Sequence, residues 1–330
     1  MAVTSKDNYL YDREDHAAAH TDDYIFSQLI PYIGNKRKLL GLIQQALHKT
    51  GVGPEATFLD VFAGSGVVSR MAKRMGFRVI ANDWEPYSFE ISKCCIQCNE
   101  APEFRSIGGY DGALTRLNTL APVEDWITKH LCPSDDGNYD ILTDRLFYTR
   151  TNGMIMDAMR IEVAQWEDAG LISPLEKACL LTPMLYQASY TSNTSGVFKG
   201  FHNGWGGQTR TALYRILSEF HLKPIIFYDN DKDNLVFKVD SADLAEALGD
   251  SGVRADVAYL DPPYNQHPYG SNYHVLNTIT LWDKPMLSER IEGRNKAAIR
   301  EDWRIQRRSA YNYRREATAA YTSLMHSLKA

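Results

Sequence analysis

The N-terminal third of the chain alternates short apolar runs with amphipathic segments. Residues 56–66 (ATFLDVFAGSG) predict a buried strand that runs into a glycine turn, and residues 77–83 (FRVIAND) predict a second buried strand. Residues 67–76, between them, predict a helix that ends at a glycine, and residues 84–100 predict another helix. A strand, a helix and a strand within about 30 residues form a βαβ unit, which requires a parallel sheet and a right-handed crossover.

Helical patterns flank and interrupt this unit. Residues 24–50 predict a turn at Gly34-Asn35 followed by an amphipathic helix. Further along, residues 144–170 and 173–190 predict two long amphipathic helices, the second with a serine cap, a proline in its first turn and a glutamate inside it.

Strand patterns return only after a long polar loop. Residues 191–211 are rich in Gly, Asn, Ser and Thr, and a loop of this length inside a compact domain is usually functional or disordered. Apolar runs at 224–230, 234–240 and 255–264 predict further strands. The parallel sheet is therefore expected to be interrupted by a helical insertion.

These patterns predict three parts. Residues 1–24 form a polar N-terminal arm, and residues 25–110 together with 236–330 form a discontinuous α/β domain. Residues 111–235 form the mainly helical insertion.

Composition narrows the class of protein. Of the 330 residues, 44% are hydrophobic and 23% charged, as in ordinary soluble proteins. We find no apolar run of about 18 residues, so we expect no membrane span. The polar, acidic N-terminus lacks the order of a signal peptide, which predicts a cytoplasmic protein.

The formal net charge is -5, so any surface that binds nucleic acid has to be local. A basic stretch is the candidate, with DNA contact and a solvated helix face as equal alternatives, because acidic residues are interspersed. Its basic residues are Arg290, Arg294, Lys296, Arg300, Arg304, Arg307, Arg308, Arg314 and Arg315.

The cysteines predict neither a metal site nor a nucleophile. Cys94, Cys95 and Cys98 cluster on a predicted helix, but neither a paired CxxC motif nor a nearby histidine supplies a fourth zinc ligand. We expect reduced, partly buried thiols and no metal. No cysteine follows a proline as the nucleophile of a cytosine-C5 methyltransferase would.

The glycine turn predicts a nucleotide-like ligand. Asp60, Gly64 and Gly66 lie at the carboxyl end of the first strand, where glycines let the backbone approach a ligand. Asp83 ends the second strand about 20 residues later, where a carboxylate can accept hydrogen bonds from ribose hydroxyls. The GxGxxG spacing is incomplete, which disfavours a dinucleotide dehydrogenase. A turn without a ligand is the alternative.

The DPPY sequence, Asp261-Pro262-Pro263-Tyr264, follows a predicted strand and predicts chemistry on an amine. The carboxylate of Asp261 and the carbonyl of Pro262 can each accept one N–H of an exocyclic amine, which aims the nitrogen lone pair at a methyl donor. The stiff proline pair holds that carbonyl in place, and Tyr264 offers a face to an extruded base. A simple proline turn is the alternative.

Together, FAGSG, DPPY and the upstream YIGNK resemble the Dam-like and FokI-type DNA adenine-N6 methyltransferases, over most of residues 25–325. The resemblance implies a Rossmann-like class I fold, S-adenosylmethionine as cofactor and double-stranded DNA as substrate. Asp243 matches the acid that contacts the cofactor's adenine, with Asp240 as a close second. The implied cofactor-binding residues are Tyr32, Gly34, Asn35, Lys36, Asp60, Phe62, Ala63, Gly64, Ser65, Gly66, Asp83, Trp84, Asp243 and Asp261.

Two segments, 192–202 and 269–279, resemble family segments around DNA-binding loops. Asparagine and glutamine can hydrogen-bond adenine, and lysine or arginine can bind guanine or phosphate. The predicted DNA contacts are Asn193, Lys199, His202, Asn203, Gln208, Arg210, Tyr269, Asn272 and Tyr273. For any one of the loop residues, the alternative is that its side chain is polar only because it lies on a solvent-exposed loop, and this interpretation is as good as DNA contact.

The family continues into a further strand and a β-hairpin after a segment like 308–330. We therefore expect a second chain to complete the sheet, with a truncated fragment as the alternative. Cytosine-N4 methylation, which uses a similar motif, is a rival activity. The first residue of the motif here is Asp261 and not a serine, which favours adenine. RNA or protein-amide methylation and a non-catalytic DNA-binding subunit are the remaining alternatives.

Overall fold

The computed structural model describes residues 23–264, 266, 268–287, 296–300, 303 and 307–329. Four parallel strands form one sheet in the order β3-β2-β1-β4. The strands are β1 (Thr57–Asp60), β2 (Arg78–Asn82), β3 (Leu235–Phe237) and β4 (Val257–Tyr259). The sheet and its flanking helices confirm the predicted Rossmann-like α/β class.

Alternating side chains of the central strands divide the core into two layers. Phe58 and Val79 point to one face, into a large cluster with residues of α2 (Leu40–Thr50), α3 (Val67–Arg74) and α4 (Pro86–Ser92). Leu59 and Ile80 point to the other face, against α10 (Leu244–Asp250) and α14 (Arg314–Ser327). Successive side chains of a strand point to opposite faces of the sheet. Because helices cover both faces here, consecutive positions are apolar and the strands appear as continuous apolar runs.

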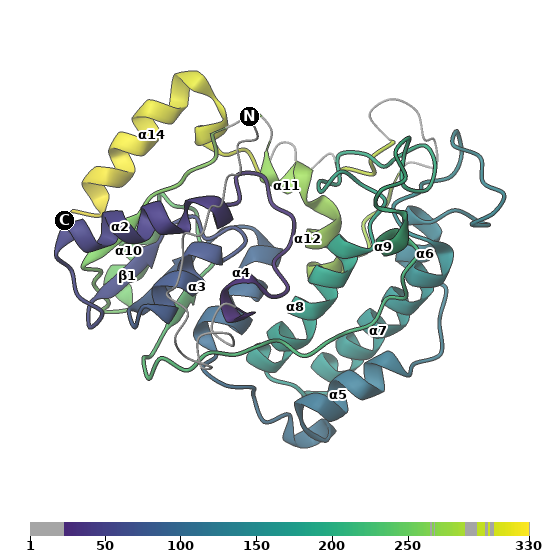
Figure 1. Ribbon diagram of the computed structural model, residues 1–330, viewed down its shortest axis with the longest axis horizontal. Coiled ribbons are helices and arrows are strands. Elements are labelled where there is room, and N and C mark those ends of the chain that lie inside the picture. The colour runs from purple at the N-terminus through teal and green to yellow at the C-terminus, as the bar shows by residue number, and fades with distance from the viewer. Residues whose placement is uncertain are drawn as a thin grey trace, which may run out of the picture.

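The predicted strand at 224–230 is wrong. These residues form an extended connection that crosses the helices without joining the sheet (Figure 1). The Ile225 N–H donates to the Tyr110 hydroxyl, and the Pro224 carbonyl accepts from Gln28 Nε2. These side-chain partners take the place of strand pairing at two backbone groups, and within the run only Ile225 is buried, whereas Ile226 is exposed.

The inserted helices lie at the opposite end of the molecule from α14 (Figure 1). They are α5 (Gly109–Asn118), α6 (Trp126–Leu131), α7 (Arg150–Asp168), α8 (Pro174–Tyr190) and α9 (Leu213–Ile216). The predicted cap of α8 is confirmed, because Ser173 and Glu176 form a reciprocal capping box. The expected helix at 144–170 begins later, at Arg150, because Thr149 caps it.

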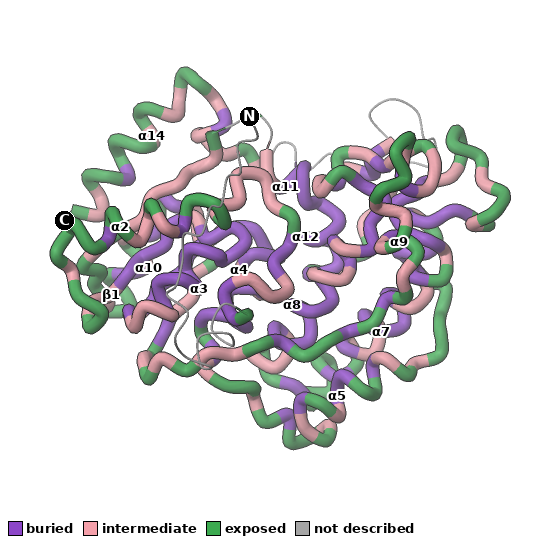
Figure 2. The backbone as a smooth tube through the Cα atoms, viewed as in Figure 1, coloured by how far each residue is buried: buried purple, intermediate pink, exposed green. Residues whose placement is uncertain are grey.

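The insertion is not separated from the sheet by a polar boundary. Helix α8 packs on α4, and α12 (His274–Leu281) packs on both. One cluster of buried residues runs from the sheet into α7 (Figure 2). The three-part division therefore stays a prediction, and the two larger parts share one core. The remaining short elements are α11 (Tyr269–Asn272), the 3-10 turns Arg37–Leu39, Arg105–Ile107 and Ala310–Asn312, and a π-helical turn Lys93–Gln97.

All five cysteines are buried, and none forms a disulfide. Cys98 Sγ lies 3.7 Å from Cys179 Sγ, which joins the π-helical turn to α8. Among the described helices, none is long and apolar enough to cross a membrane.

Candidate functional site

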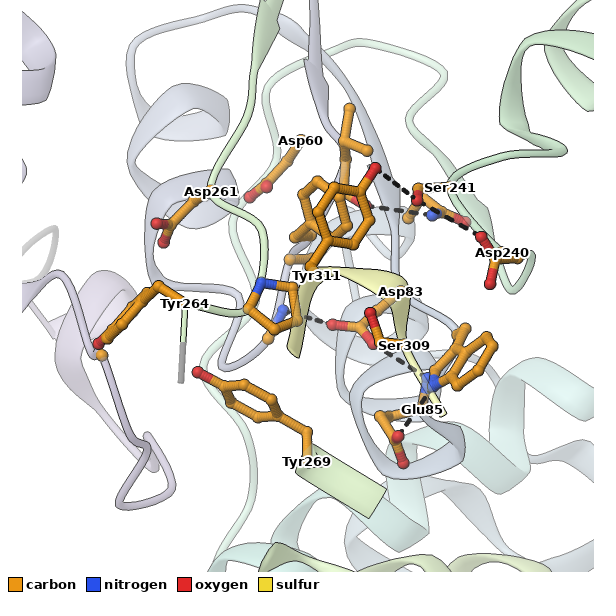
Figure 3. Close-up of a pocket in the computed structure, with 18 of the residues that line it drawn as sticks. Asp60, Asp83, Glu85, Asp240, Ser241, Asp261, Tyr264, Tyr269, Ser309 and Tyr311 are labelled. Atoms are coloured by element: carbon orange, nitrogen blue, oxygen red, sulfur yellow. Dashed lines mark hydrogen bonds between the residues drawn. The ribbon is translucent and has the colours of Figure 1, made fainter. Parts of the chain in front are cut away.

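A cavity of about 380 Å³ opens at the carboxyl ends of β1, β2 and β4. The glycine turn and residues 32–36 contribute to its walls, as do residues 239–242 after β3, residues 307–312 and the later turns of α14. Asp261 and Tyr264 lie at one end of the cavity, and Asp240 and Ser241 lie at the other (Figure 3). Parallel strands bring their carboxyl ends to one edge, so residues distant in sequence meet here.

The glycine turn after β1 needs its glycines. Gly64 has a φ of +54°, and a Cβ there would lie 2.7 Å from the ring of Tyr32. Its N–H donates to Asp83 Oδ2 at 2.8 Å, and its carbonyl accepts from the Ser88 hydroxyl at 2.7 Å. A side chain at Gly64 would strain the backbone and push away Tyr32.

Asp83 fixes the turn and faces the cavity. Its Oδ1 accepts from the Glu85 N–H at 2.9 Å, while Oδ2 holds Gly64. Burial raises the pKa of Asp83 above its usual range. Glu85 lies behind it and accepts from the Trp84 indole and the Asn277 amide. Hydrogen bonds through Glu85 therefore link Asp83, at the cavity, to Asn277 of α12.

The DPPY and YIGNK segments meet at one end of the cavity. Lys36 Nζ lies 2.5 Å from Asp261 Oδ2 and donates to the Gly34 carbonyl at 2.8 Å. The same ammonium lies 5.5 Å from the centre of the Tyr264 ring. Gly34 has a φ of +77°, and a Cβ there would overlap the Tyr264 hydroxyl. The two predicted motifs, more than half the chain apart, form one corner of the site.

Stacked tyrosines form the wall beside this corner. The Tyr32 ring stacks on Tyr273, with ring centres 5.1 Å apart, and Tyr269 packs at 5.3 Å from Tyr32. The Tyr273 hydroxyl accepts from the Ile33 N–H at 2.7 Å. Tyr269 lines the cavity, whereas Tyr273 and Asn272 are buried beneath it. Burial contradicts the predicted role of both as DNA contacts: Tyr273 supports the tyrosine wall, and the Asn272 carbonyl accepts from the Phe198 N–H at 2.7 Å.

Asp240 occupies the position that we predicted for Asp243. Residues 239–242 line the cavity, whereas Asp243 lies outside the lining, at the start of α10. Asp240 Oδ1 accepts from the Ala242 N–H at 2.9 Å. The short turn before α10 thus puts Asp240 and not Asp243 in the lining, and the contact with the cofactor's adenine stays a prediction.

The sequence analysis missed one wall of the cavity. Tyr311 packs edge-on against Phe62, with ring centres 5.2 Å apart, and its hydroxyl accepts from Ser241 at 3.2 Å. Arg307 lines the same side and lies 3.5 Å from Glu85 Oε2. No local motif marks these residues, because their position depends on how the chain returns to the sheet before α14.

The predicted DNA contacts of the insertion divide into two groups. Asn193 is fully buried: its amide donates to the Leu146 and His202 carbonyls and its oxygen accepts from Gly206 N. Asn193 therefore holds the loop together and does not face DNA. The others lie on the surface or at its margin: Lys199, Asn203, Gln208 and Arg210 are exposed, and His202 is half-buried.

The basic stretch is only partly described. Arg290, Arg294 and Arg304 lie outside the described residues. Arg300 pairs with Asp283, and Arg308 pairs with Glu316. Lys296 Nζ donates to Asn203 and lies 4.9 Å from the Phe201 ring centre, which brings the stretch beside the polar loop.

Asp60, at the end of β1, is a buried carboxyl group of the site. It is 1% exposed, and Oδ2 accepts from the Ser69 hydroxyl at 2.6 Å. Oδ1 has no hydrogen-bond partner among the described residues. Burial raises the pKa of Asp60 to about 7, and the negative charges of Asp261 and Asp83 add to this effect.

This carboxyl predicts a pH dependence of stability. The folded pKa lies above the ordinary 3.8, so between these values the folded chain binds more protons than the unfolded chain. The contribution of Asp60 therefore favours folding below about pH 4 and is lost as the pH rises through about 7. Asp60→Asn cannot ionise, so its melting temperature should fall less between pH 5 and pH 7.5 than that of the wild type.

The control for this prediction is Asp250→Asn, at an exposed position in α10. Its melting curve should follow the wild type at each pH. Identical pH profiles for Asp60→Asn and the wild type would contradict the prediction.

Comparisons with known proteins agree with this geometry. Residues 32–298 match the family model of D12 class N6 adenine-specific DNA methyltransferases. The modification methylase LlaI of Lactococcus lactis subsp. lactis is 31% identical over 78% of this chain and 39% of its own length. The type II methyltransferase M.NlaIII of Neisseria lactamica is 30% identical over 76% of this chain and 69% of its own length.

The type II methyltransferase M.FokI of Planomicrobium okeanokoites is 28% identical over 89% of this chain. The chain spans about two fifths of the length of the LlaI and FokI relatives. No solved structure matches it. The family model covers most of the chain, including the YIGNK, FAGSG and DPPY segments that form the cavity. The chain therefore belongs to the D12 class of N6 adenine-specific DNA methyltransferases.

Proposed function

We propose that this chain is the catalytic part of a site-specific DNA methyltransferase that transfers a methyl group from S-adenosylmethionine to N6 of a flipped-out adenine. One observation carries the proposal: Asp261, the first residue of DPPY, opens into the same cavity as the glycine turn of β1. A methyl donor held at the turn and an amine held at Asp261 would meet in one enclosed space.

The residues present fit S-adenosylmethionine. The cavity of about 380 Å³ is within the usual range for small-ligand sites. Asp83 and Asp240 offer acceptors to ribose and adenine, and the glycine turn lets the backbone approach the ligand. Five carboxyl groups (Asp60, Asp83, Glu85, Asp240 and Asp261) and three cations (Lys36, Arg307 and Arg308) line the cavity, an acidic excess that suits a cationic ligand. When bound, the cofactor supplies an electrophilic methyl group on a positively charged sulfur.

Asp261 and the Pro262 carbonyl orient the acceptor amine. The exocyclic nitrogen of adenine is a weak nucleophile, because its lone pair is delocalised into the ring. Two acceptors for its two N–H groups favour a tetrahedral nitrogen with the lone pair directed toward the methyl group. Lys36, 2.5 Å from Asp261, holds the carboxylate in place. The reaction needs positioning more than covalent catalysis.

Tyr264 is suited to stack against the extruded base. Its side chain is 64% exposed at the mouth of the cavity, although it is a large aromatic residue. Flipping a base costs a few kcal/mol of lost stacking and pairing, and stacking on an aromatic ring offsets part of this cost. The exposed loop residues Lys199, Asn203, Gln208 and Arg210 are proposed to contact bases or phosphates of the target.

Asp261→Ala tests the catalytic assignment. Loss of the acceptor should lower methyl transfer at least about 100-fold, while binding of S-adenosylmethionine persists. The assay uses labelled S-adenosylmethionine, duplex DNA and this chain with any copurifying partner, and mass spectrometry identifies the methylated base. N4-methylcytosine in the wild-type product, or an active Asp261→Ala variant, would overturn the proposal.

A pair of neighbouring acids tests the cofactor site. Asp240→Ala should weaken S-adenosylmethionine binding at least about 10-fold, because it removes a charged acceptor at the adenine end of the cavity. Asp243→Ala, three residues along and outside the lining, should bind as the wild type does. Isothermal titration calorimetry measures both affinities. The opposite result would restore the original assignment of Asp243.

We also propose that a second chain extends the sheet beyond β4. Within the described ranges, β4 pairs with β1 alone, and Ala258 at its centre is exposed. An unpaired strand edge offers hydrogen-bonding groups to another strand. A tagged chain purified from its native cells should bring down a stoichiometric partner, detected by mass spectrometry and light scattering. A lone monomer with full methyltransferase activity would contradict this proposal.

A further inference from the structure

A second cavity, of about 480 Å³, lies on the other side of the segment that borders the first. Residues 32–36 line the first cavity, whereas Leu29, Pro31 and Arg37 line the second. Its opposite wall comes from the last turn of α8 and from the start of the polar loop. None of the methyl-transfer steps described above uses this second cavity.

The charged groups on its walls are cations. Arg37 and Arg215 line it, and no Asp or Glu does so among the described residues. Arg37 Nη2 donates to the Leu29 carbonyl at 3.3 Å. Arg215 donates to carbonyls at the end of α8, including that of Ser192 at 3.0 Å. Both guanidinium groups are thus partnered by neutral carbonyl oxygens.

Burial lowers the pKa of both arginines, because the charge of each is partly removed from water. The groups that raise these pKa values are tyrosines and not carboxylates. The cavity therefore carries positive charge without an internal counterion, which is a favourable environment for an anion.

The remaining walls are aromatic and hydroxyl-bearing. Tyr186 and Tyr190, one helical turn apart at the end of α8, stack with ring centres 6.0 Å apart and 23° between their planes. Both are half-buried, and Ser195 adds an exposed hydroxyl group. Arginine with aromatic rings and hydroxyl groups is the combination that binds a phosphate together with a sugar or base.

The cavity lies between two parts of the proposed DNA path. Residues 194–196, on its wall, belong to the loop that carries the exposed Lys199, Gln208 and Arg210. The segment ending at Arg37, on the opposite wall, continues from Lys36 at the catalytic corner. The two walls of the cavity therefore continue along the chain into the proposed DNA-contacting loop and into the catalytic corner.

We propose that this second cavity binds a phosphodiester group of the substrate DNA on Arg37, with the adjoining sugar or base against Tyr186 and Tyr190. The proposal rests on the proposed function, because it takes DNA as the substrate. Arg215, fixed by the α8 carbonyls, adds positive charge without moving. Phosphate contacts position DNA without reading its sequence, so the cavity sets the register of the duplex relative to Asp261.

The test compares two neighbouring cations. Arg37→Gln removes the proposed phosphate contact, and Lys38→Gln removes the same charge at the next residue. Both residues are exposed, but only Arg37 lines the cavity. DNA affinity is measured by fluorescence anisotropy over a range of salt concentrations, with this chain and any copurifying partner. Arg37→Gln should reduce the slope of log K against log salt by about 0.9, equally for cognate and unrelated duplexes.

Lys38→Gln should keep the wild-type slope, and Arg37→Lys should keep most of it, because a cation remains in the cavity. Unchanged S-adenosylmethionine binding and melting temperature show that Arg37→Gln still folds. Equal slopes for Arg37→Gln and the wild type, or equal losses in both glutamine variants, would overturn the cavity assignment. The cavity assignment would also be overturned if Arg37→Gln weakened the binding of free nucleotides but left the affinity for duplex DNA unchanged. A wild-type protein that binds no DNA would instead refute the proposed function.

Discussion

The missing side chain at Gly64 is the constraint on which the site depends. Because Gly64 has no Cβ, the Tyr32 ring can lie directly against the backbone of the turn. A Cβ at this position would lie 2.7 Å from the ring. Tyr32 in turn stacks on Tyr273, whose hydroxyl holds the Ile33 backbone. The segment leading to Lys36 is therefore placed by a glycine in the turn after β1, and Lys36 contacts Asp261 just after β4. A chain of short-range contacts thus connects the cofactor end of the site to its chemical end.

Electrostatics distinguishes the two cavities on either side of this segment. Five carboxyl groups and three cations line the first, where burial raises the pKa of Asp60 and the charges of Asp261 and Asp83 add to this effect. Two arginines with carbonyl partners face the second. A chain with a net charge of -5 can therefore offer one acidic cavity to a cationic cofactor and one basic cavity to a polyanion.

The shared core explains how the helical insertion can be coupled to the sheet. Helix α8 packs on α4, and α4 begins directly after the Asp83 turn. Asn277 on α12 donates to Glu85, which also pairs with Arg307 on the far wall. Helix α8 of the insertion and Glu85 of the cavity wall thus both contact α12, so a shift in one is resisted by packing around the other.

The sequence by itself determined the parts of the site that are local in the chain. A buried strand followed by FAGSG, and a strand followed by DPPY, specify a glycine turn and an acidic corner whatever surrounds them, because strand burial and glycine or proline geometry are local properties. The tertiary structure alone decided that Asp240 faces the cavity in place of Asp243, that Tyr311 closes a wall, and that Asn193 and Tyr273 are buried. It also decided that residues 224–230 run beside helices and not in the sheet. Whether a polar or apolar side chain is exposed depends on which distant segment packs over it, and that information is not contained in any short stretch of sequence.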